Sequence, residues 1–222
     1  MSDFSHLEYW EDSEIKIKKA KESVEKLRNE AQGYFDIFEE SKAAEKRREA
    51  YKAKIQSSIA YQQKLDGLKT RFFEIASDSN PHQKGFKLEK FLNDLFRFFD
   101  LDPKSSFKIT GEQIDGAFTF DNTDYLLEAK WQEKPITASD LYNFGGKISG
   151  KLKNTLGLYV SLGIYSSECT ETQNPTTKSM ILMDGPDLIQ ILEGRITLND
   201  MIYIKRRHAS QTGEIYYKFA DI

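Results

Sequence analysis

The chain is poor in residues on which several common sites and folds depend. Its 222 residues include one cysteine, three histidines and five prolines. The single cysteine, Cys169, forms no disulfide within the chain, and no known catalytic pattern links a histidine to it, so a disulfide framework and a thiol nucleophile are both disfavoured. The histidines lack the spacing of zinc ligands. These absences indicate a cytosolic protein that folds around an apolar core.

Long apolar runs and a strong net charge are also missing. No stretch approaches the roughly 18 apolar residues that span a bilayer, and the N-terminus lacks the basic and apolar regions of a signal peptide. The net charge is −3, whereas proteins that coat nucleic acid non-specifically are usually basic. A metal-dependent nuclease site is itself acidic, so this charge does not exclude a nucleic-acid substrate. We predict a cytoplasmic protein without membrane association.

Proline is absent from about residue 12 to residue 76, where apolar side chains recur at helical spacing. The apolar stripe is narrow and is surrounded by Lys, Arg and Glu, so the helix needs a partner: the second arm of a hairpin or another subunit. An isolated solvated helix is the alternative. The stripe consists of Ala20, Val24, Leu27, Ala31, Tyr34 and Phe38, and then of Tyr51, Ile55, Leu65, Leu68 and Phe72.

The segment Ser77-Asp-Ser-Asn-Pro81 has the composition of a linker. It divides the chain into a helical coiled-coil or hairpin region, 1–80, and a second domain, 81–222. The order of elements in that domain predicts an α/β fold with a mixed sheet flanked by helices. These elements are a helix at 84–99, strands at 106–109, 113–120 and 125–131, a helix at 138–152, strands at 155–165 and 179–183, short helices at 186–192 and 198–205, and a strand at 214–219.

The strands at 113–120 and 125–131 form a hairpin with one polar face. We take Asn122 and Thr123 as its two-residue turn, which pairs Asp121 with Asp124. Asp115 then lies opposite Lys130, with Glu128 as its diagonal neighbour about 7–8 Å away at the backbone. A slip of one residue would mix the faces. The polar face carries Asp115, Ala117, Thr119, Leu126, Glu128 and Lys130, and the apolar face carries Ile114, Phe118, Phe120, Tyr125, Leu127, Ala129 and Trp131.

Two carboxylates beside a lysine are the minimal set for metal-dependent phosphodiester hydrolysis. Asp115 and Glu128 are expected to bind Mg²⁺, or Mn²⁺, and the carbonyl of Ala129 to complete the metal shell. Such a metal polarises the scissile phosphate and lowers the pKa of a bound water. Lys130 is expected to orient that water or to stabilise the developing charge. An ordinary solvated strand face is the alternative for so short a pattern.

Other residues extend this candidate site. Glu89 lies at the edge of the apolar stripe of helix 84–99, so it is expected to face the sheet and to bind a metal directly or through water. Gln132 follows on the same face as Lys130 and is a candidate contact for a phosphate or water. The candidate nucleic-acid contacts, each with a solvated surface position as its alternative, are Lys147, Lys151, Lys153, Lys205 and Arg206.

The helix expected at 138–152 contains Gly145, Gly146 and Gly150, which are costly in a helix. We expect these glycines where the helix lies close to another backbone. Its inward positions include Leu152.

With these elements placed, the chain from about residue 83 to its end resembles the PD-(D/E)XK nuclease superfamily, and within it the Mrr-like restriction endonucleases. The resemblance implies a three-layer α/β/α fold, Mg²⁺-dependent hydrolysis of DNA, and an active site of Glu89, Asp115, Glu128 and Lys130. Many Mrr-like proteins carry Gln where this chain has Glu128, a departure that favours metal binding. The residues that carry the resemblance are Gly85–Leu92, Gly111-Glu-Gln-Ile-Asp115-Gly-Ala, Leu127-Glu128-Ala-Lys130-Trp, Gly157–Ser161 and Met180–Gly185.

Three functions stay open on these grounds. The preferred one is a DNA endonuclease that forms a homo-oligomer, or joins a partner protein, through its N-terminal helices; the resemblance adds a role in defence against foreign DNA. The second is a non-catalytic protein that acts through the coiled coil, with a nuclease-like domain that binds nucleic acid or only folds. The third is a nuclease that cuts branched DNA or RNA.

Overall fold

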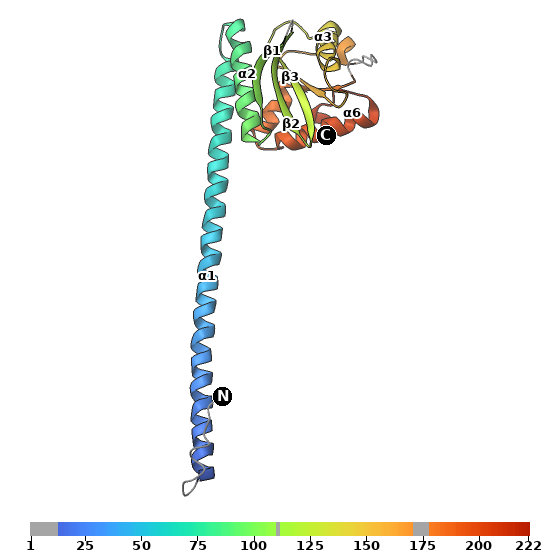
Figure 1. Ribbon diagram of the computed structural model, residues 1–222. Coiled ribbons are helices and arrows are strands. Elements are labelled where there is room, and N and C mark those ends of the chain that lie inside the picture. Colours follow the sequence, from blue (N-terminus) through green and yellow to red (C-terminus); the bar gives the residue numbers. More distant parts are fainter. Residues whose placement is uncertain (1–12, 110–111, 171–177) are drawn as a thin grey trace. The chain divides into compact units, whose positions relative to one another are not determined.

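The computed structural model describes residues 13–109, 112–170 and 178–222, so Gly111 of the predicted motif lies outside the described residues. The chain divides into two units, residues 1–60 and 61–222 (Figure 1). Each is considered by itself. Within the described ranges, no helix is both long enough and apolar enough to cross a membrane.

Helix α1 spans Ser13–Ala76 and confirms the long N-terminal helix. In the first unit its apolar stripe is not covered by the rest of that unit: Leu27, Tyr51 and Ile55 are 65%, 66% and 42% exposed. The side chains of Ala31, Tyr34 and Phe38 lie outside what the structure describes. A partner helix for this stripe stays a prediction.

The second unit begins at Tyr61, so the last turns of α1 belong to it. Leu65 and Phe72 of α1 are buried in one core cluster with the apolar face of α2, which spans Pro81–Phe98. Pro81 takes the first position of α2, where the missing N–H of proline costs no helical hydrogen bond. The functional division at residue 80 stays a prediction.

A mixed sheet of five strands, in the order β1-β2-β3-β4-β5, forms the centre of the second unit. The first three strands are antiparallel, and β4 and β5 continue the sheet in parallel with β3. The strand bounds are β1 Lys104–Ile109, β2 Glu112–Phe120, β3 Thr123–Lys130, β4 Leu156–Ser161 and β5 Met180–Asp184.

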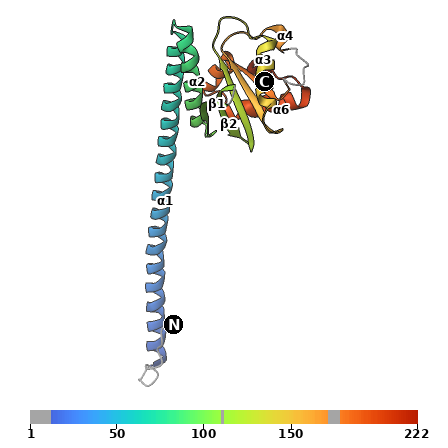
Figure 2. The same cartoon turned by 45° about the horizontal axis from the view of Figure 1, so that its top comes forward.

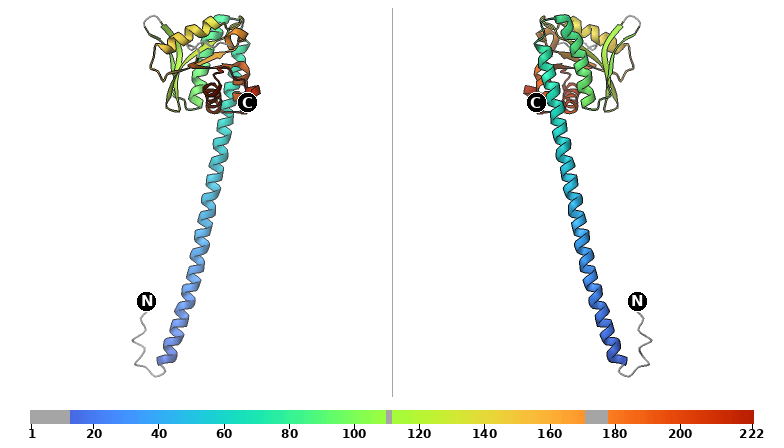
Figure 3. Two further views of the ribbon diagram at one scale, coloured as in Figure 1. Left: turned by 90° about the vertical axis from the view of Figure 1, so that its right-hand side faces the viewer. Right: turned by 90° about the vertical axis from the view of Figure 1, so that its left-hand side faces the viewer.

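Helices cover both faces of this sheet (Figures 2 and 3). One face packs in a core cluster with α2, with α5 (Gly185–Leu192) and with α6 (Leu198–Thr212). The other face packs in a second cluster with α3 (Ala138–Ser149) and with Cys169 of α4 (Ser167–Thr170). This arrangement confirms the expected three-layer α/β/α fold.

The hairpin turn differs from the predicted one. Phe120 pairs with Thr123, so the turn residues are Asp121 and Asn122, with φ angles of 50° and 55°. Asp and Asn adopt positive φ more readily than the β-branched Thr123, and a two-residue hairpin turn of this kind needs positive φ at both positions. The register therefore moves by two residues, which preserves the faces of the strands, and its continuation sets Asp115 level with Glu128.

Two expectations about side-chain direction are wrong. Ile114 packs in the cluster on the α3 side of the sheet, away from Phe118. Leu152 is 76% exposed, because α3 ends at Ser149. The close approach expected at the glycines of α3 occurs at Gly157 of β4, where an added Cβ would lie 2.3 Å from Ile148 Cδ1. Nothing lies within 4 Å of a Cβ added at Gly146.

The terminal strand expected at 214–219 does not form. The Ile215 carbonyl accepts one hydrogen bond from the Leu182 N–H at 2.9 Å, but the segment then turns away. Its backbone groups bind buried side chains: the Phe219 N–H donates to Asp187 Oδ1 at 3.1 Å, and Lys205 Nζ donates to the Tyr217 carbonyl. A buried ion pair thus replaces a β ladder as the anchor of this end.

We expect Lys205→Met to lower the free energy of unfolding by about 3–5 kcal/mol, the usual cost of leaving one member of a buried ion pair alone. Lys205 Nζ lies 2.7 Å from Asp187 Oδ2, and both side chains are fully buried. Urea denaturation measures the change. Arg207→Met, at an exposed position of the same helix, is the control and should shift stability by no more than about 0.5 kcal/mol. Equal shifts in the two variants would contradict the role given to the pair.

Candidate active site

One cavity of about 460 Å³ collects most of the predicted site residues. It opens between α2 and the ends of β1, β2 and β3 that lie near Asp115. Its lining includes Glu89 from α2, Asp115 from β2, and Ala129, Lys130 and Gln132 from β3 and the loop after it. The structure therefore brings together residues from distant parts of the sequence at one point of the sheet.

Asp115 is held where β2 and β3 part. The ladder between these strands ends at the pair Gly116 and Leu127. One residue further, the Asp115 carboxylate replaces a strand carbonyl and accepts a hydrogen bond from the Ala129 N–H at 3.0 Å. The side chain is only 9% exposed. Burial, and then the charge of Glu128, raise the pKa of Asp115 above its ordinary value.

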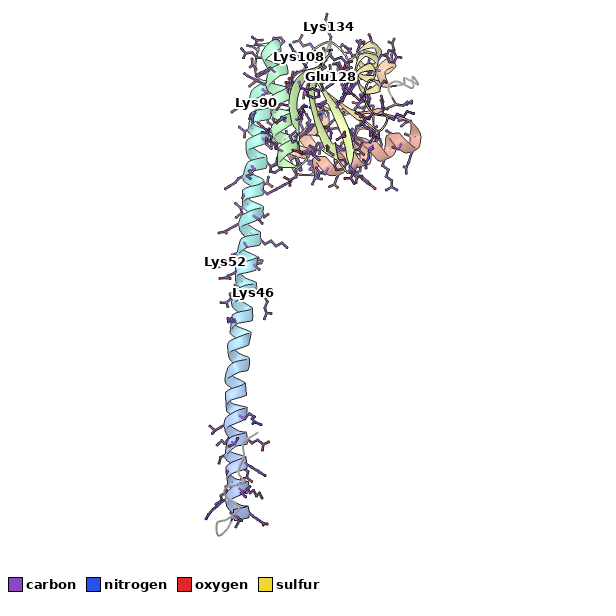
Figure 4. All side chains as sticks on the ribbon, in the orientation of Figure 1. Lys46, Lys52, Lys90, Lys108, Glu128 and Lys134 are labelled. Carbon is purple, nitrogen blue, oxygen red and sulfur yellow. The ribbon has the colours of Figure 1, made fainter. Side chains whose placement is uncertain are left out.

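Glu128 is buried beside two lysines. Its Oε1 lies 3.1 Å from Lys130 Nζ, and its Oε2 lies 2.7 Å from Lys147 Nζ (Glu128 is labelled in Figure 4). Lys130 follows two residues later on β3, whereas Lys147 comes from α3. Lys147 was expected from the sequence to contact nucleic acid, so its contact with Glu128 was not predicted. Its spacing from Lys151 marked a basic pair, but the acid that it meets depends on how α3 packs on the sheet.

Glu89 adds a third carboxylate from the other helical layer. Its side chain is half-buried on α2 and lines the cavity together with Asp115. Burial, followed by the charge of Asp115, raises the pKa of Glu89. The same two causes, loss of water and a neighbouring acid, therefore act on Glu89 and Asp115. Lys108 and Lys130 line the same cavity.

A divalent cation fits this set of donors. Carboxylate and carbonyl oxygens are the ligands that Mg²⁺ and Mn²⁺ prefer, and a cation would relieve the repulsion among Glu89, Asp115 and Glu128. In the part of the chain that the structure describes, no three acidic or histidine side chains lie close enough to hold a metal together. Glu128 is engaged by Lys130 and Lys147 instead. Metal binding thus requires Glu128 to exchange a lysine for the ion.

The remaining predicted residues do not form one basic surface. Gln132 donates from Nε2 to the Lys134 carbonyl at 3.2 Å. Lys151 pairs with Glu112 at 3.0 Å, and Lys153 is exposed.

The two basic residues of α6 lie elsewhere. Arg206 pairs with Asp121 at 2.5 Å, at the hairpin end that lies about 20 Å from Asp115, at about 3.3 Å per strand residue. The expectation of a surface contact at Lys205 is wrong, because that side chain is buried and forms an ion pair with Asp187.

Residues 82–192, half of the chain, match the family Mrr_cat, described as restriction endonuclease. No curated protein matches the sequence.

Three solved structures are similar in part. A protein of unknown function, AF1548, shares 12% identity at a TM-score of 0.37, over 55% of this chain and 76% of its own. The restriction endonuclease MspJI, solved in complex with a 27-mer oligonucleotide, shares 14% sequence identity at a TM-score of 0.35, over 67% of this chain. The DNA modification-dependent restriction endonuclease AspBHI shares 15% sequence identity at a TM-score of 0.37, over 69% of this chain. The chain spans only 35% and 40% of the lengths of these two enzymes.

We expect Asp115→Asn to stabilise the metal-free protein at pH 7. Because the folded state raises the pKa of Asp115, its contribution to stability is present below its ordinary pKa of about 3.9 and is lost as the pH rises through the folded value. The amide of Asn still accepts from the Ala129 N–H. Scanning calorimetry in EDTA should show a higher Tm for the variant than for the wild type at pH 7. Each kcal/mol of added stability raises Tm by about 2–4 °C. Near pH 3.5 the two proteins should have the same Tm.

Asp124→Asn, an exposed acid on the same hairpin, is the control and should change Tm little at either pH. A lower Tm for Asp115→Asn at pH 7 would show that the carboxylate stabilises the fold and would contradict the prediction.

Proposed function

The chain belongs to the Mrr_cat family of restriction endonucleases, and we propose on this basis that it is a metal-dependent endonuclease that hydrolyses phosphodiester bonds in DNA. The observation that carries the proposal is the single cavity in which Glu89, Asp115 and Lys130 meet, with Glu128 bound to the same lysine. Clustered, largely buried carboxylates next to a lysine are what a phosphoryl-transfer site with a cation requires, and they have no evident purpose in a domain that only folds.

The side chains divide the work as follows. Asp115 and Glu128 are the first metal ligands, with Glu89 and the Ala129 carbonyl completing the set around Mg²⁺ or Mn²⁺. A metal bound there would polarise the scissile phosphate and lower the pKa of a bound water. Lys130, about half-exposed beside Glu128, orients the attacking water or neutralises the charge that develops on the phosphate. Gln132, at the cavity wall, contacts a phosphate or a water.

The biological setting and assembly are also proposals. A restriction endonuclease family favours DNA as substrate and a role in defence against foreign DNA. Cutting both strands of a duplex needs two active sites. The exposed stripe on α1, with Leu27 at 65% and Tyr51 at 66% exposure, supports pairing with a second copy or with a partner protein.

We expect Asp115→Ala and Lys130→Ala to slow the cleavage of supercoiled plasmid about a hundredfold or more, because each removes a group that acts on the transition state. Agarose gels of reactions with Mg²⁺, with Mn²⁺ and with EDTA measure the rate. Asp124→Ala and Lys134→Ala are matched controls at exposed positions and should cut like the wild type. Equal nicking by all the proteins would indicate a contaminant. DNA binding without cleavage by the wild type would favour the non-catalytic alternative.

We also expect Lys147→Met to tighten Mn²⁺ binding at least fivefold, because Lys147 and the metal compete for Oε2 of Glu128. Removing a positive charge a few ångströms from the site favours the cation, since unit charges at 4 Å interact by about 4 kcal/mol at an effective dielectric constant of 20. Isothermal titration calorimetry measures the affinity. Lys151→Met, one turn away and bound to Glu112, is the control. Weaker binding in Lys147→Met would show that this lysine positions Glu128 for the metal instead of competing with it.

A further inference from the structure

A line of side chains runs along the solvent face of α2. Phe86, Lys90, Asn93 and Arg97 follow one another at spacings of four, three and four residues, which sets them on one face of a helix. The opposite face of α2 is buried in the core. Phe86, Lys90 and Arg97 are exposed and Asn93 is half-buried, so this line is not part of the packing that holds α2 in place.

This line forms one wall of a hollow of about 410 Å³, and Ser105 and Ser106 of β1 form the other. Phe86, Glu89 and Ser106 line both this hollow and the cavity of the candidate active site. The two spaces therefore adjoin at these three residues. We refer to this hollow as the α2 trough. Two acids are part of its lining, which consists of Phe86, Glu89, Lys90, Asn93, Asp94, Arg97, Ser105 and Ser106.

The cations of the α2 trough are available to a ligand. In the described parts of the chain, Lys90 and Arg97 take part in no ion pair. Neighbouring charges on the same helix are already paired: Asp94 with Arg71 at 2.6 Å and Lys87 with Asp78 at 2.5 Å. Lys90 and Arg97 lie about 10 Å apart along the helix axis, at about 1.5 Å per residue. They therefore offer two separate positive points to an extended, negatively charged chain.

Phe86 sits at the junction of the trough with the catalytic cavity and is 70% exposed. A phenyl ring left in water at the edge of a polar site gains most from a flat apolar partner. An unpaired base is such a partner, and stacking of a base on an aromatic side chain contributes about 1–3 kcal/mol. In a duplex the bases stack on each other, so their faces are not open to a phenyl ring.

We propose that the α2 trough binds a single-stranded DNA segment adjoining the bond that is cut. Phe86 stacks on an unpaired base, and Lys90 and Arg97 contact phosphates of the same strand. The substrate class is then DNA with a single-stranded tail or gap beside a duplex. This inference rests on the proposed function, since the cavity that the strand adjoins is the site of cleavage.

Fluorescence anisotropy in EDTA tests the trough without cleavage. The probes are one blunt duplex, the same duplex with a single-stranded tail, and the tail alone. We expect wild-type protein to bind the tailed duplex more tightly than the blunt one, and Phe86→Ala to weaken binding of the tailed duplex and the tail at least fivefold while leaving the blunt duplex unchanged. Lys90→Ala combined with Arg97→Ala should have the same selective effect, with a weaker dependence on salt.

Two controls separate this site from exposed rings and charges in general. Phe73→Ala removes a ring that is 48% exposed and lines neither space, and Lys46→Ala combined with Lys52→Ala removes the same charge from exposed positions of α1 (both labelled in Figure 4). Equal losses with these variants, equal losses on blunt and tailed DNA, or no loss with Phe86→Ala would overturn the proposal. So would tighter binding of an RNA tail than of the DNA tail. A protein that cuts neither plasmid nor the tailed duplex with Mg²⁺ or Mn²⁺, but shows the Phe86-dependent preference, would refute the nuclease function and leave the proposed strand site supported.

Discussion

The second unit has to hold several carboxylates close together and largely out of water, and the rest of its structure depends on this constraint. Glu89 and Asp115 both have raised pKa values, each through burial first and a neighbouring acid second. Such a group is unfavourable in a folded protein unless a hydrogen bond or a cation offsets it. The Ala129 N–H donates a hydrogen bond to Asp115, and Lys130 and Lys147 form ion pairs with Glu128. The architecture around the cavity can be understood as the supply of these partners.

The acids and their partners come from both layers of helices. α2 brings Glu89 from one face of the sheet, and α3 brings Lys147 from the other, so the point where β2 and β3 part is reached from both sides. The close packing of α3 on β4 depends on Gly157, because any side chain there would collide with Ile148. Gly157, remote from the acids, thus leaves room for α3, which carries Lys147, to pack close to the sheet.

The prediction from sequence succeeded where a pattern is local and repeated. The predicted apolar face of the hairpin held for Phe118, Tyr125, Leu127 and Ala129 although the turn was misplaced, since an error of two residues preserves which side a strand residue faces. Ile114 is the exception, because it packs on the α3 side. Asp115 and Glu128 were therefore placed on neighbouring strands at one site, and the helix that carries Glu89 was found from its apolar period. Failures came where the partner lies far away in sequence. Lys205 looked like any surface lysine, and only the fold brings Asp187 to it.

The hydrogen bond between the Ala129 N–H and Asp115 links the register of the hairpin to the integrity of the candidate site. The peptide that binds the Asp115 carboxylate lies between Glu128 and Lys130, so one short stretch of β3 both receives one acid and carries the other groups. A hairpin closed one residue out of step would turn Phe118 and Tyr125 toward the wrong layer and would at once separate Asp115 from its donor. A hairpin paired in this way would accordingly lose stability and the arrangement of the candidate site together.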